Sequence, residues 1–200
     1  MTPKQIGQAY DQITHLWESD EFDRSNGIAQ HQHALSFAAN YHHALDIGCG
    51  CTNRIIDLLS ADFDTVEGLD ISANMLDVAR AKRPDILFHH ADFLQWQSPH
   101  HYDFMSCWDA LWHIPLADQP KALTKILDLL APGGVCIFSF GGLEEPDSHS
   151  NNYMGVTMAY ATLGIKGYRR IISECRCIEQ TLEFDQNGEK HCFMVIQKPS

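Results

Sequence analysis

The chain has 200 residues, of which 44% are hydrophobic and 20% are charged, so it can bury a substantial core as one domain. Its 14 lysines and arginines against 26 acidic residues give a formal charge of −12, and such an acidic surface repels phosphate backbones and disfavours a nucleic-acid substrate. No apolar stretch is as long as a membrane span, and the seven scattered cysteines favour a reducing cytoplasm over a disulfide framework.

The segment 1–40 is predicted to be a helical lid. Apolar side chains recur at helical spacing until turn formers interrupt the pattern at 19–27, and a second helix is expected over 28–39. The apolar stripe of the first helix consists of Ile6, Ala9, Tyr10, Ile13 and Trp17.

The segment 41–140 is predicted to be the core, because strands and helices alternate along it. Such alternation is typical of a parallel sheet with helices on both faces. Ser72 is placed to cap one helix, and Pro84 ends it. The strands are expected at 44–48, 65–70, 86–93, 102–110 and 135–142, and the helices at 52–61, 72–83 and 118–134.

The segment 141–200 departs from this alternation. Its last two strands and the turn between them are predicted to form a hairpin, which adds an antiparallel strand to the sheet. The elements expected here are a polar insert at 144–155, a helix at 166–177, a strand near 178–185, a turn at 186–190 and a final strand at 191–198.

The ends of the first four strands carry residue types that suit a nucleoside. Ligands of open α/β sheets bind at the carboxyl ends of the strands. A carboxylate can accept both hydrogen bonds of a ribose diol, and an acid beside an aromatic ring suits adenine. In chain order these residues are Gly48 with Gly50, Asp70, Asp92 with Phe93, and Trp108 with Asp109. Four such exits in succession indicate one binding site.

The glycine loop separates two classes of ligand. A dinucleotide loop, G-x-G-x-x-G, would need a third glycine where the chain has Asn53. Asp46 stands two residues before Gly48, and a carboxylate there repels a pyrophosphate but attracts an ammonium group. S-adenosylmethionine has adenine, a ribose diol, an α-ammonium and no phosphate.

With this loop and these strand ends, residues 44–140 resemble the class I S-adenosylmethionine-dependent methyltransferases, and the flanks resemble their small-molecule members. The resemblance implies a seven-stranded Rossmann-like sheet and S-adenosylmethionine as the cofactor. No metal is expected, because the C-x-C pairs Cys49/Cys51 and Cys175/Cys177 lack a second pair at zinc-site spacing and the histidines lack the H-E-x-x-H pattern, with a metal site as the minor alternative. The glycine loop would surround the methionine part, Asp70 would bind the ribose, and the third strand end would hold the adenine. The cofactor-binding residues so implied are Asp46, Ile47, Gly48, Cys49, Gly50, Asp70, Ile71, Met75, Asp92, Phe93, Cys107 and Trp108.

The resemblance extends to the lid. Tyr10 and Trp17 share one helix face, and in small-molecule members an aromatic hydroxyl of the lid meets the cofactor carboxylate; the alternative is that both rings only pack the helix onto the sheet. Arg24 is either the carboxylate partner or an ordinary surface residue. The family often has a third glycine where this chain has Thr52, which is predicted to cap the next helix.

The acceptor side is less defined by the sequence. His113 and Asp109 are candidates for a general base, with a packing or capping role as the alternative for His113. Trp112 is expected either to wall the acceptor pocket or to join the core. Tyr153 and its neighbour His149 are expected on a mobile substrate-side loop.

The predicted function is methyl transfer to a small molecule in the cytoplasm, with a protein side chain as the second acceptor class. A non-catalytic S-adenosylmethionine-binding or regulatory protein of the same fold is the alternative, because a fold does not imply catalysis. An NAD or nucleotide-sugar enzyme is a third hypothesis. The chain is expected to be a monomer or homodimer, without nucleic acid or membrane as a partner.

Overall fold

The computed structural model describes residues 1–186, 188 and 190–200. Seven strands form one sheet: β1 (His43–Ile47), β2 (Thr65–Asp70), β3 (Leu87–His90), β4 (Tyr102–Cys107), β5 (Leu130–Gly141), β8 (Ile178–Phe184) and β9 (His191–Gln197). Their order is β3-β2-β1-β4-β5-β9-β8. The strands β1 to β5 pair in parallel, whereas β9 is antiparallel to both β5 and β8. This confirms the predicted sheet; Asn187 and Glu189 of the expected turn lie outside the described residues.

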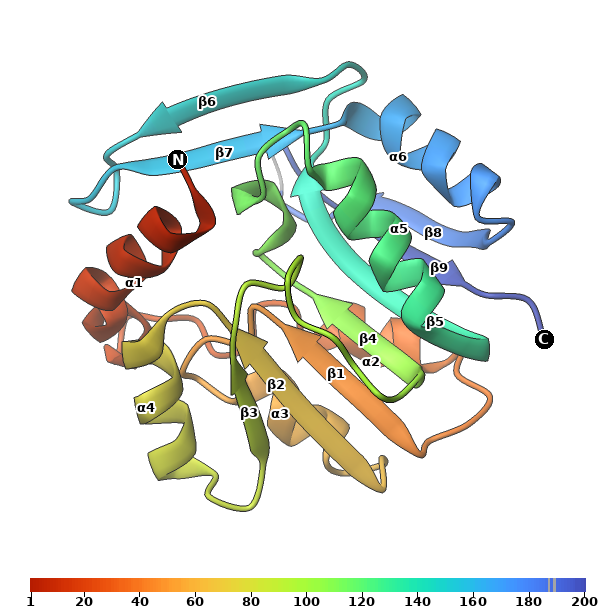
Figure 1. Ribbon diagram of the computed structural model, residues 1–200, viewed down its shortest axis with the longest axis horizontal. Coiled ribbons are helices and arrows are strands. Elements are labelled where there is room, and N and C mark those ends of the chain that lie inside the picture. Colours follow the sequence, from red (N-terminus) through yellow and green to blue (C-terminus); the bar gives the residue numbers. More distant parts are fainter. Residues whose placement is uncertain (187, 189) are drawn as a thin grey trace.

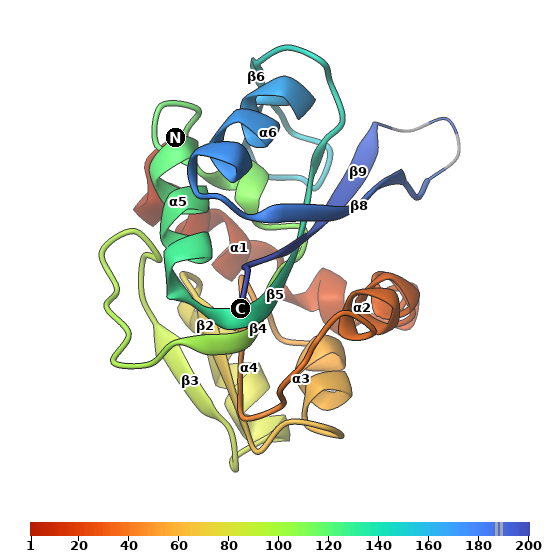
Figure 2. The ribbon, with the colours of Figure 1, turned by 90° about the vertical axis from the view of Figure 1, so that its right-hand side faces the viewer.

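Helices cover both faces of the sheet, as predicted. One face carries α2 (Ile28–Leu35), α3 (Arg54–Leu59) and α4 (Ala73–Lys82), and the other carries α5 (Gln119–Leu129) and α6 (Gly164–Glu174). Figure 2 shows α5 and α6 on one side of the strands and α2 and α3 on the other. Ser72 caps α4 by accepting a hydrogen bond from the Met75 amide. Within the described part of the chain, no helix is long and apolar enough to cross a membrane.

The parallel strands end along one edge, and helix α1 (Pro3–Glu18) lies across it. Figure 1 shows the arrowheads of β1, β2 and β4 directed toward α1. The helix starts with a capping box, in which Thr2 and Gln5 satisfy each other's backbone amides. The predicted apolar stripe faces inward, and Ile6, Ala9 and Ile13 pack against Met158.

The expected polar insert, 144–155, contains the first strand and most of the turn of a β-hairpin that the sequence did not predict. Strand β6 (Asp147–Asn151) pairs antiparallel with β7 (Met158–Thr162). Four of the five β6 residues are exposed, so the strand lacks the alternation of apolar and polar residues by which a half-buried strand is recognised. The hairpin lies above α1 and the ends of the sheet strands (Figure 1), and together with α1 it covers the edge where the strands end.

The main boundary error lies at the start of β5. Helix α5 was expected to continue to residue 134, but it ends at Leu129 and β5 begins at Leu130. Pro132 has no amide hydrogen to continue the helix, and Gly133 adopts φ +76°.

Candidate functional site

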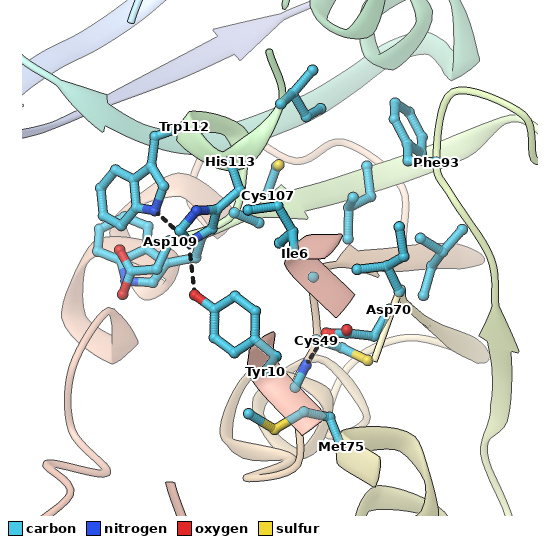
Figure 3. Close-up of a pocket in the computed structure, with 18 of the residues that line it drawn as sticks. Ile6, Tyr10, Cys49, Asp70, Met75, Phe93, Cys107, Asp109, Trp112 and His113 are labelled. Carbon is cyan, nitrogen blue, oxygen red and sulfur yellow. Dashed lines mark hydrogen bonds between the residues drawn. The ribbon is translucent and has the colours of Figure 1, made fainter. Parts of the chain in front are cut away.

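A cavity of about 350 Å³ lies where the parallel strands end, beneath α1 and the β6–β7 hairpin. Figure 3 shows its wall, with the lid residues Ile6 and Tyr10 facing side chains from the sheet. Sixteen of the residues predicted for the site line this one cavity: Tyr10, Trp17, Ile47, Gly48, Cys49, Gly50, Asp70, Ile71, Met75, Asp92, Phe93, Cys107, Trp108, Asp109, Trp112 and His113.

The glycine loop needs both of its glycines. Gly48 has φ +72°, and a Cβ there would come within 2.4 Å of the Ala110 Cβ. Gly50 has φ +58°, and a Cβ there would meet nothing within 4 Å. Gly48 therefore lets the loop pack against the segment after β4, and Gly50 leaves its backbone open to the cavity.

Asp70 is held by backbone amides at the end of β2. Its Oδ2 accepts a hydrogen bond from the Gly50 amide at 2.9 Å, and its Oδ1 accepts one from the Ser72 amide at 2.8 Å. Burial raises the pKa of this carboxyl, and the backbone hydrogen bonds partly oppose the rise. Each oxygen retains a lone pair after these contacts, so the carboxylate can accept two hydrogen bonds from a diol.

The third strand end combines an acid with an apolar surface. Asp92 accepts a hydrogen bond from the Leu94 amide, while Phe93 is buried. The Lys125 ammonium lies 4.8 Å from the Phe93 ring centroid. On the opposite wall Met75 contributes a buried side chain. A flat aromatic ligand with hydrogen-bonding edges fits such surroundings.

The cation of the cavity wall is Arg54 rather than the predicted Arg24, which is exposed and lies off the cavity. The Nε of Arg54 donates to the Asn26 backbone carbonyl at 2.9 Å, and the Arg54 guanidinium lies 5.2 Å from the Phe22 ring centroid. Burial lowers the pKa of Arg54, but arginine stays charged in proteins. Its position at the start of the helix after the glycine loop was the signal that could have identified it.

Thr52 does not cap the next helix, contrary to the prediction. The N-cap of α3 is Asn53, with φ +59° and no capping hydrogen bond from its side chain. Instead, the Thr52 hydroxyl accepts a hydrogen bond from Arg54 Nη1 at 3.0 Å. The residue at the usual third glycine therefore positions the arginine of the cavity.

Asp46 lies beneath the cavity wall rather than on it. It is 3% exposed. Burial raises the pKa of its carboxyl to about 7, against the opposing effects of a hydrogen bond with Ser106 and the charge of Arg54. Asp46 does not line the cavity. The loop above it therefore separates its carboxylate from a ligand, and the predicted direct contact with an ammonium group does not fit this position.

The lid is fastened to the segment that joins β2 to α4. Asp11 accepts hydrogen bonds from the Ser72 hydroxyl at 2.6 Å and the Asn74 amide at 3.0 Å. A Cβ on Gly7 would lie 2.6 Å from the Ile71 carbonyl oxygen, so the helix backbone directly approaches the segment after β2. These contacts hold α1 over the cavity.

At the other end, the lid meets His113. Tyr10 and His113 share a hydrogen bond of 2.7 Å through Nε2, which Trp112 Nε1 also approaches at 3.1 Å. His113 Nδ1 lies 2.9 Å from the Ala159 carbonyl oxygen, which can only accept, so Nδ1 carries the hydrogen and Nε2 is the acceptor. Burial lowers the pKa of His113 to about 4. The ring is therefore neutral, with its lone pair directed at two donors.

The hairpin brings Tyr160, which was not predicted, to the cavity, whereas His149 and Tyr153, which were expected on the substrate side, do not line it. Tyr160 of β7 lines the cavity, with its ring centroid 5.1 Å from that of His113 and 6.4 Å from that of Trp112. His149 of β6 stacks on the other side of Tyr160 and faces a second cavity of about 340 Å³. Tyr153 is 92% exposed and points away from both cavities, because it lies in the turn of the hairpin.

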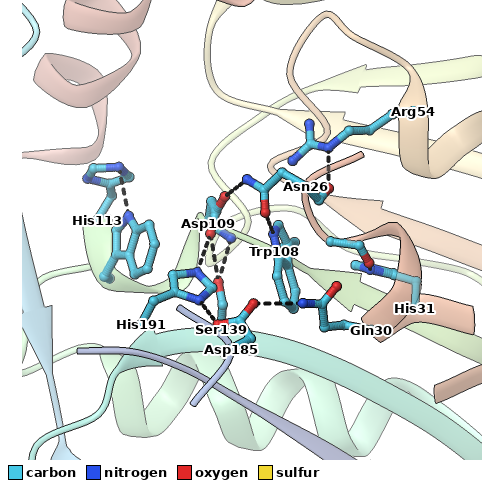
Figure 4. A network of polar contacts seen from close by, with 12 residues as sticks. Asn26, Gln30, His31, Arg54, Trp108, Asp109, His113, Ser139, Asp185 and His191 are labelled. Carbon is cyan, nitrogen blue, oxygen red and sulfur yellow. Dashed lines mark hydrogen bonds and ion pairs between the residues drawn. The ribbon is translucent and has the colours of Figure 1, made fainter. Parts of the chain in front are cut away.

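Asp109 is the centre of a polar network (Figure 4). The residue has φ +56°, and its carboxylate accepts hydrogen bonds from Asn26 Nδ2, Ser139 Oγ and His191 Nε2. The other ring nitrogen of His191 contacts Asp185 at 2.5 Å. Burial lowers the pKa of His191, but its two carboxylate partners outweigh this effect, so the net shift is upward. Sequence analysis did not identify His191 or Asp185, which are remote from Asp109 along the chain.

Comparisons with known proteins agree with this architecture. Residues 44–134 match the family model described as "Methyltransferase domain". Over 95 residues the chain is 33% identical to a dTDP-3-amino-3,6-dideoxy-alpha-D-glucopyranose N,N-dimethyltransferase of Streptomyces fradiae, covering 46% of this chain and 37% of that protein. Over 94 residues it is 38% identical to a trans-aconitate 2-methyltransferase of Methylobacterium radiotolerans, covering 46% of this chain and 35% of that protein.

The likeness in fold extends over nearly the whole chain. The crystal structure of the N-methyltransferase NodS from Bradyrhizobium japonicum with S-adenosyl-L-homocysteine superimposes with a TM-score of 0.72 at 15% identity, covering 98% of this chain and 99% of that one. The matches to the two curated relatives span only 37% and 35% of their lengths. By this match over residues 44–134, by its motifs and by its fold, the chain is similar to the class I S-adenosylmethionine-dependent methyltransferases.

Proposed function

We propose that the protein transfers a methyl group from S-adenosylmethionine to a small-molecule acceptor. The observation that carries this proposal is the convergence of the glycine loop, Asp70, Asp92 and the segment after β4 on one covered cavity. Under the proposal, residues 1–40 act as the lid, 41–140 as the cofactor-binding core and 141–200 as the acceptor side.

The residues of the cavity fit this cofactor. Asp70 would hold the ribose through its free lone pairs, and Phe93 and Met75 would enclose the adenine. Arg54 would meet the α-carboxylate, because a guanidinium binds a carboxylate through two parallel hydrogen bonds. Gly50, with open space beside its Cα, leaves room for the methionine chain.

When bound, S-adenosylmethionine supplies an electrophilic methyl group on a sulfonium. The protein contributes by aligning the acceptor and excluding water, which together can lower the barrier by about 7–11 kcal/mol. The covering lid supports the exclusion of water, since Tyr10 joins it to His113. His113 Nε2 already accepts from Tyr10 and Trp112, and the depressed pKa of the ring makes it a weak base, so its role is to hold the lid and the aromatic wall in place.

The acceptor is proposed to be a small molecule. The relatives are named for methylation of an amino sugar nucleotide and of trans-aconitate, which supports this class without selecting one metabolite. The aromatic walls formed by Trp112 and Tyr160 suit a compact ligand. The rival function, binding of the cofactor without catalysis, predicts no space beyond the methionine part, whereas this cavity continues to Trp112, His113 and Tyr160.

The test is transfer of an isotopically labelled methyl group into a metabolite extract, read by mass spectrometry. Protein with S-adenosylmethionine should produce a labelled small molecule, and an Asp70→Ala variant should produce much less. The proposal fails if S-adenosylhomocysteine binds the protein but no extract from a range of bacteria yields a labelled product, because the rival function would then hold.

A further inference from the structure

We infer that Asp109 is a binding site for a cationic nitrogen, kept charged and aimed into the cavity by His191 and Asp185. The inference rests on the proposed function, because it names a further contact within that same cavity. An ammonium could come from the α-amino group of the cofactor or from an amine acceptor, and the geometry of the site recognises their shared chemistry.

The first support is the accessibility of the Asp109 carboxylate. Its side chain is 30% exposed, and the residue lines the cavity with Trp108 and Trp112. Oδ1 accepts from His191 at 2.9 Å and Ser139 at 3.1 Å, whereas Oδ2 accepts only a 3.2 Å hydrogen bond from Asn26 among its described partners. Because a carboxylate oxygen has two acceptor sites, Oδ2 can accept another hydrogen bond from a ligand.

The second support is the charge of the cluster. Both ring nitrogens of His191 face carboxylate oxygens, so both must donate and the ring is an imidazolium. Its ring centroid lies 5.3 Å from that of Trp108 and 5.5 Å from that of Trp112, an arrangement that stabilises a cation. Gln30 Nε2 donates to Asp185. One cation between two carboxylates leaves these three side chains with a net charge of −1, and of the three only Asp109 lines the cavity.

The third support is the position of Asp46. It is buried beneath the wall, so the carboxylate predicted from sequence to attract an ammonium is covered, whereas the half-buried Asp109 lines the cavity beside Trp108. Asn26 links Arg54 to Asp109. Its backbone carbonyl accepts from Arg54 Nε, and its side-chain Nδ2 donates to Asp109 Oδ2. A cation and an anion joined through one residue match the two charges of an amino acid.

If the acceptor is an amine, Asp109 would also receive its proton. A bound ammonium would pass one proton to the carboxylate, and its freed lone pair would form the new N–CH₃ bond. The electrons of the broken S–CH₃ bond would return to sulfur, leaving a neutral thioether and a methylated ammonium. The carboxyl would release its proton to water after the product leaves.

The experiment measures binding by calorimetry in the wild type and in Asp109→Asn, which keeps the shape of the side chain but removes its charge. The probes are S-adenosylhomocysteine and 5′-methylthioadenosine, which lacks the amino-acid part, and cyclohexylamine or cyclohexanol added to protein saturated with S-adenosylhomocysteine. Asp147→Asn, an exposed acid of the second cavity, is the matched control and should bind every probe as the wild type does.

Two results would support the inference and identify the source of the nitrogen. If the cofactor supplies it, Asp109→Asn should weaken S-adenosylhomocysteine by about 10- to 100-fold and leave 5′-methylthioadenosine unchanged. If an acceptor supplies it, cyclohexylamine should bind the wild type in the millimolar range and lose affinity in the variant, while cyclohexanol shows no such change. His191→Gln should give a smaller loss in the same direction.

Other outcomes overturn the inference. Equal weakening of S-adenosylhomocysteine and 5′-methylthioadenosine would assign Asp109 a structural role. Unchanged binding of every probe by Asp109→Asn would exclude a charged contact. If Asp109→Asn fails to fold, normal binding of every probe by a folded His191→Gln would exclude it instead. Failure of the wild type to bind either nucleoside would instead contradict the proposed function, so the two failures are distinguishable.

Discussion

Replacement of Asp70 by asparagine tests the assignment of the ribose site. The variant keeps the size of the side chain but exchanges one acceptor oxygen for an NH₂ donor. Because Oδ1 and Oδ2 each accept a backbone amide, one amide must lose its acceptor whichever way the new group is oriented. The ligand also loses the charged partner of its diol.

The expected magnitude follows from these contacts. A hydrogen bond to a charged group contributes about 1.5–3 kcal/mol, so loss of the charge facing two ribose hydroxyls should weaken binding by about 100-fold or more. The unpaired backbone amide should lower the free energy of unfolding by about 1–3 kcal/mol. Both S-adenosylhomocysteine and 5′-methylthioadenosine contain the ribose, so both should weaken, in contrast to their expected behaviour at Asp109.

Isothermal titration calorimetry with these two ligands, together with chemical denaturation, separates the two effects. Asp77→Asn is the matched control, because the Asp77 side chain is 75% exposed on α4. The ribose assignment is refuted if the folded Asp70→Asn protein binds S-adenosylhomocysteine within about threefold of the wild type, or if only one of the two ligands weakens.

Three further predictions concern the loop, the lid and the buried histidines. Gly48→Ala should lower the free energy of unfolding by about 1–3 kcal/mol more than Gly155→Ala, since both have positive φ but only a Cβ at 48 meets another side chain; equal losses in denaturation would argue against the close packing. Asp11→Ala removes the lid's contacts with the start of α4 and should speed S-adenosylhomocysteine dissociation about tenfold in stopped flow; an unchanged rate would mean that the lid does not limit release. Burial lowers the pKa of His31 and of His113 to about 4, below the unfolded value of about 6.5, so the unfolded state binds more protons and each should cost about 2 kcal/mol of stability between pH 7 and pH 5. His113→Phe should remove about 2 kcal/mol of that loss, and an unchanged difference in stability between pH 7 and pH 5 would assign the loss to other groups.

The fold could be predicted from sequence because its signals are local. The run from Ala44 to Ile47 is buried in β1, as a strand covered on both faces should be, and helical spacing located α1. The β6–β7 hairpin was missed because β6 is polar along its length. The roof of the cavity therefore depends on pairing with β7, which no short window of sequence reveals.

The site was predictable where a candidate binding residue directly follows a strand in the sequence. Asp70 and Asp92 line the cavity because parallel pairing brings their strand ends to one edge. Of the two roles left open for Arg24, the structure fits the ordinary surface position, and Arg54 lines the cavity instead. Sequence could not show this, because the position of Arg54 depends on how the loop after β1 folds. His191 could not be found, since its role depends on β9 pairing antiparallel with β5 and so bringing it to Asp109.

A crystal structure with S-adenosylhomocysteine would test the central claim most directly. The ribose hydroxyls should lie within hydrogen-bonding distance of Asp70, the adenine should lie beside Phe93, and the carboxylate should meet Arg54. The sulfur should face the end of the cavity formed by Trp112, His113 and Tyr160. A ligand with its ribose away from Asp70, or a sulfur directed away from those rings, would contradict the proposed methyl transfer in this cavity.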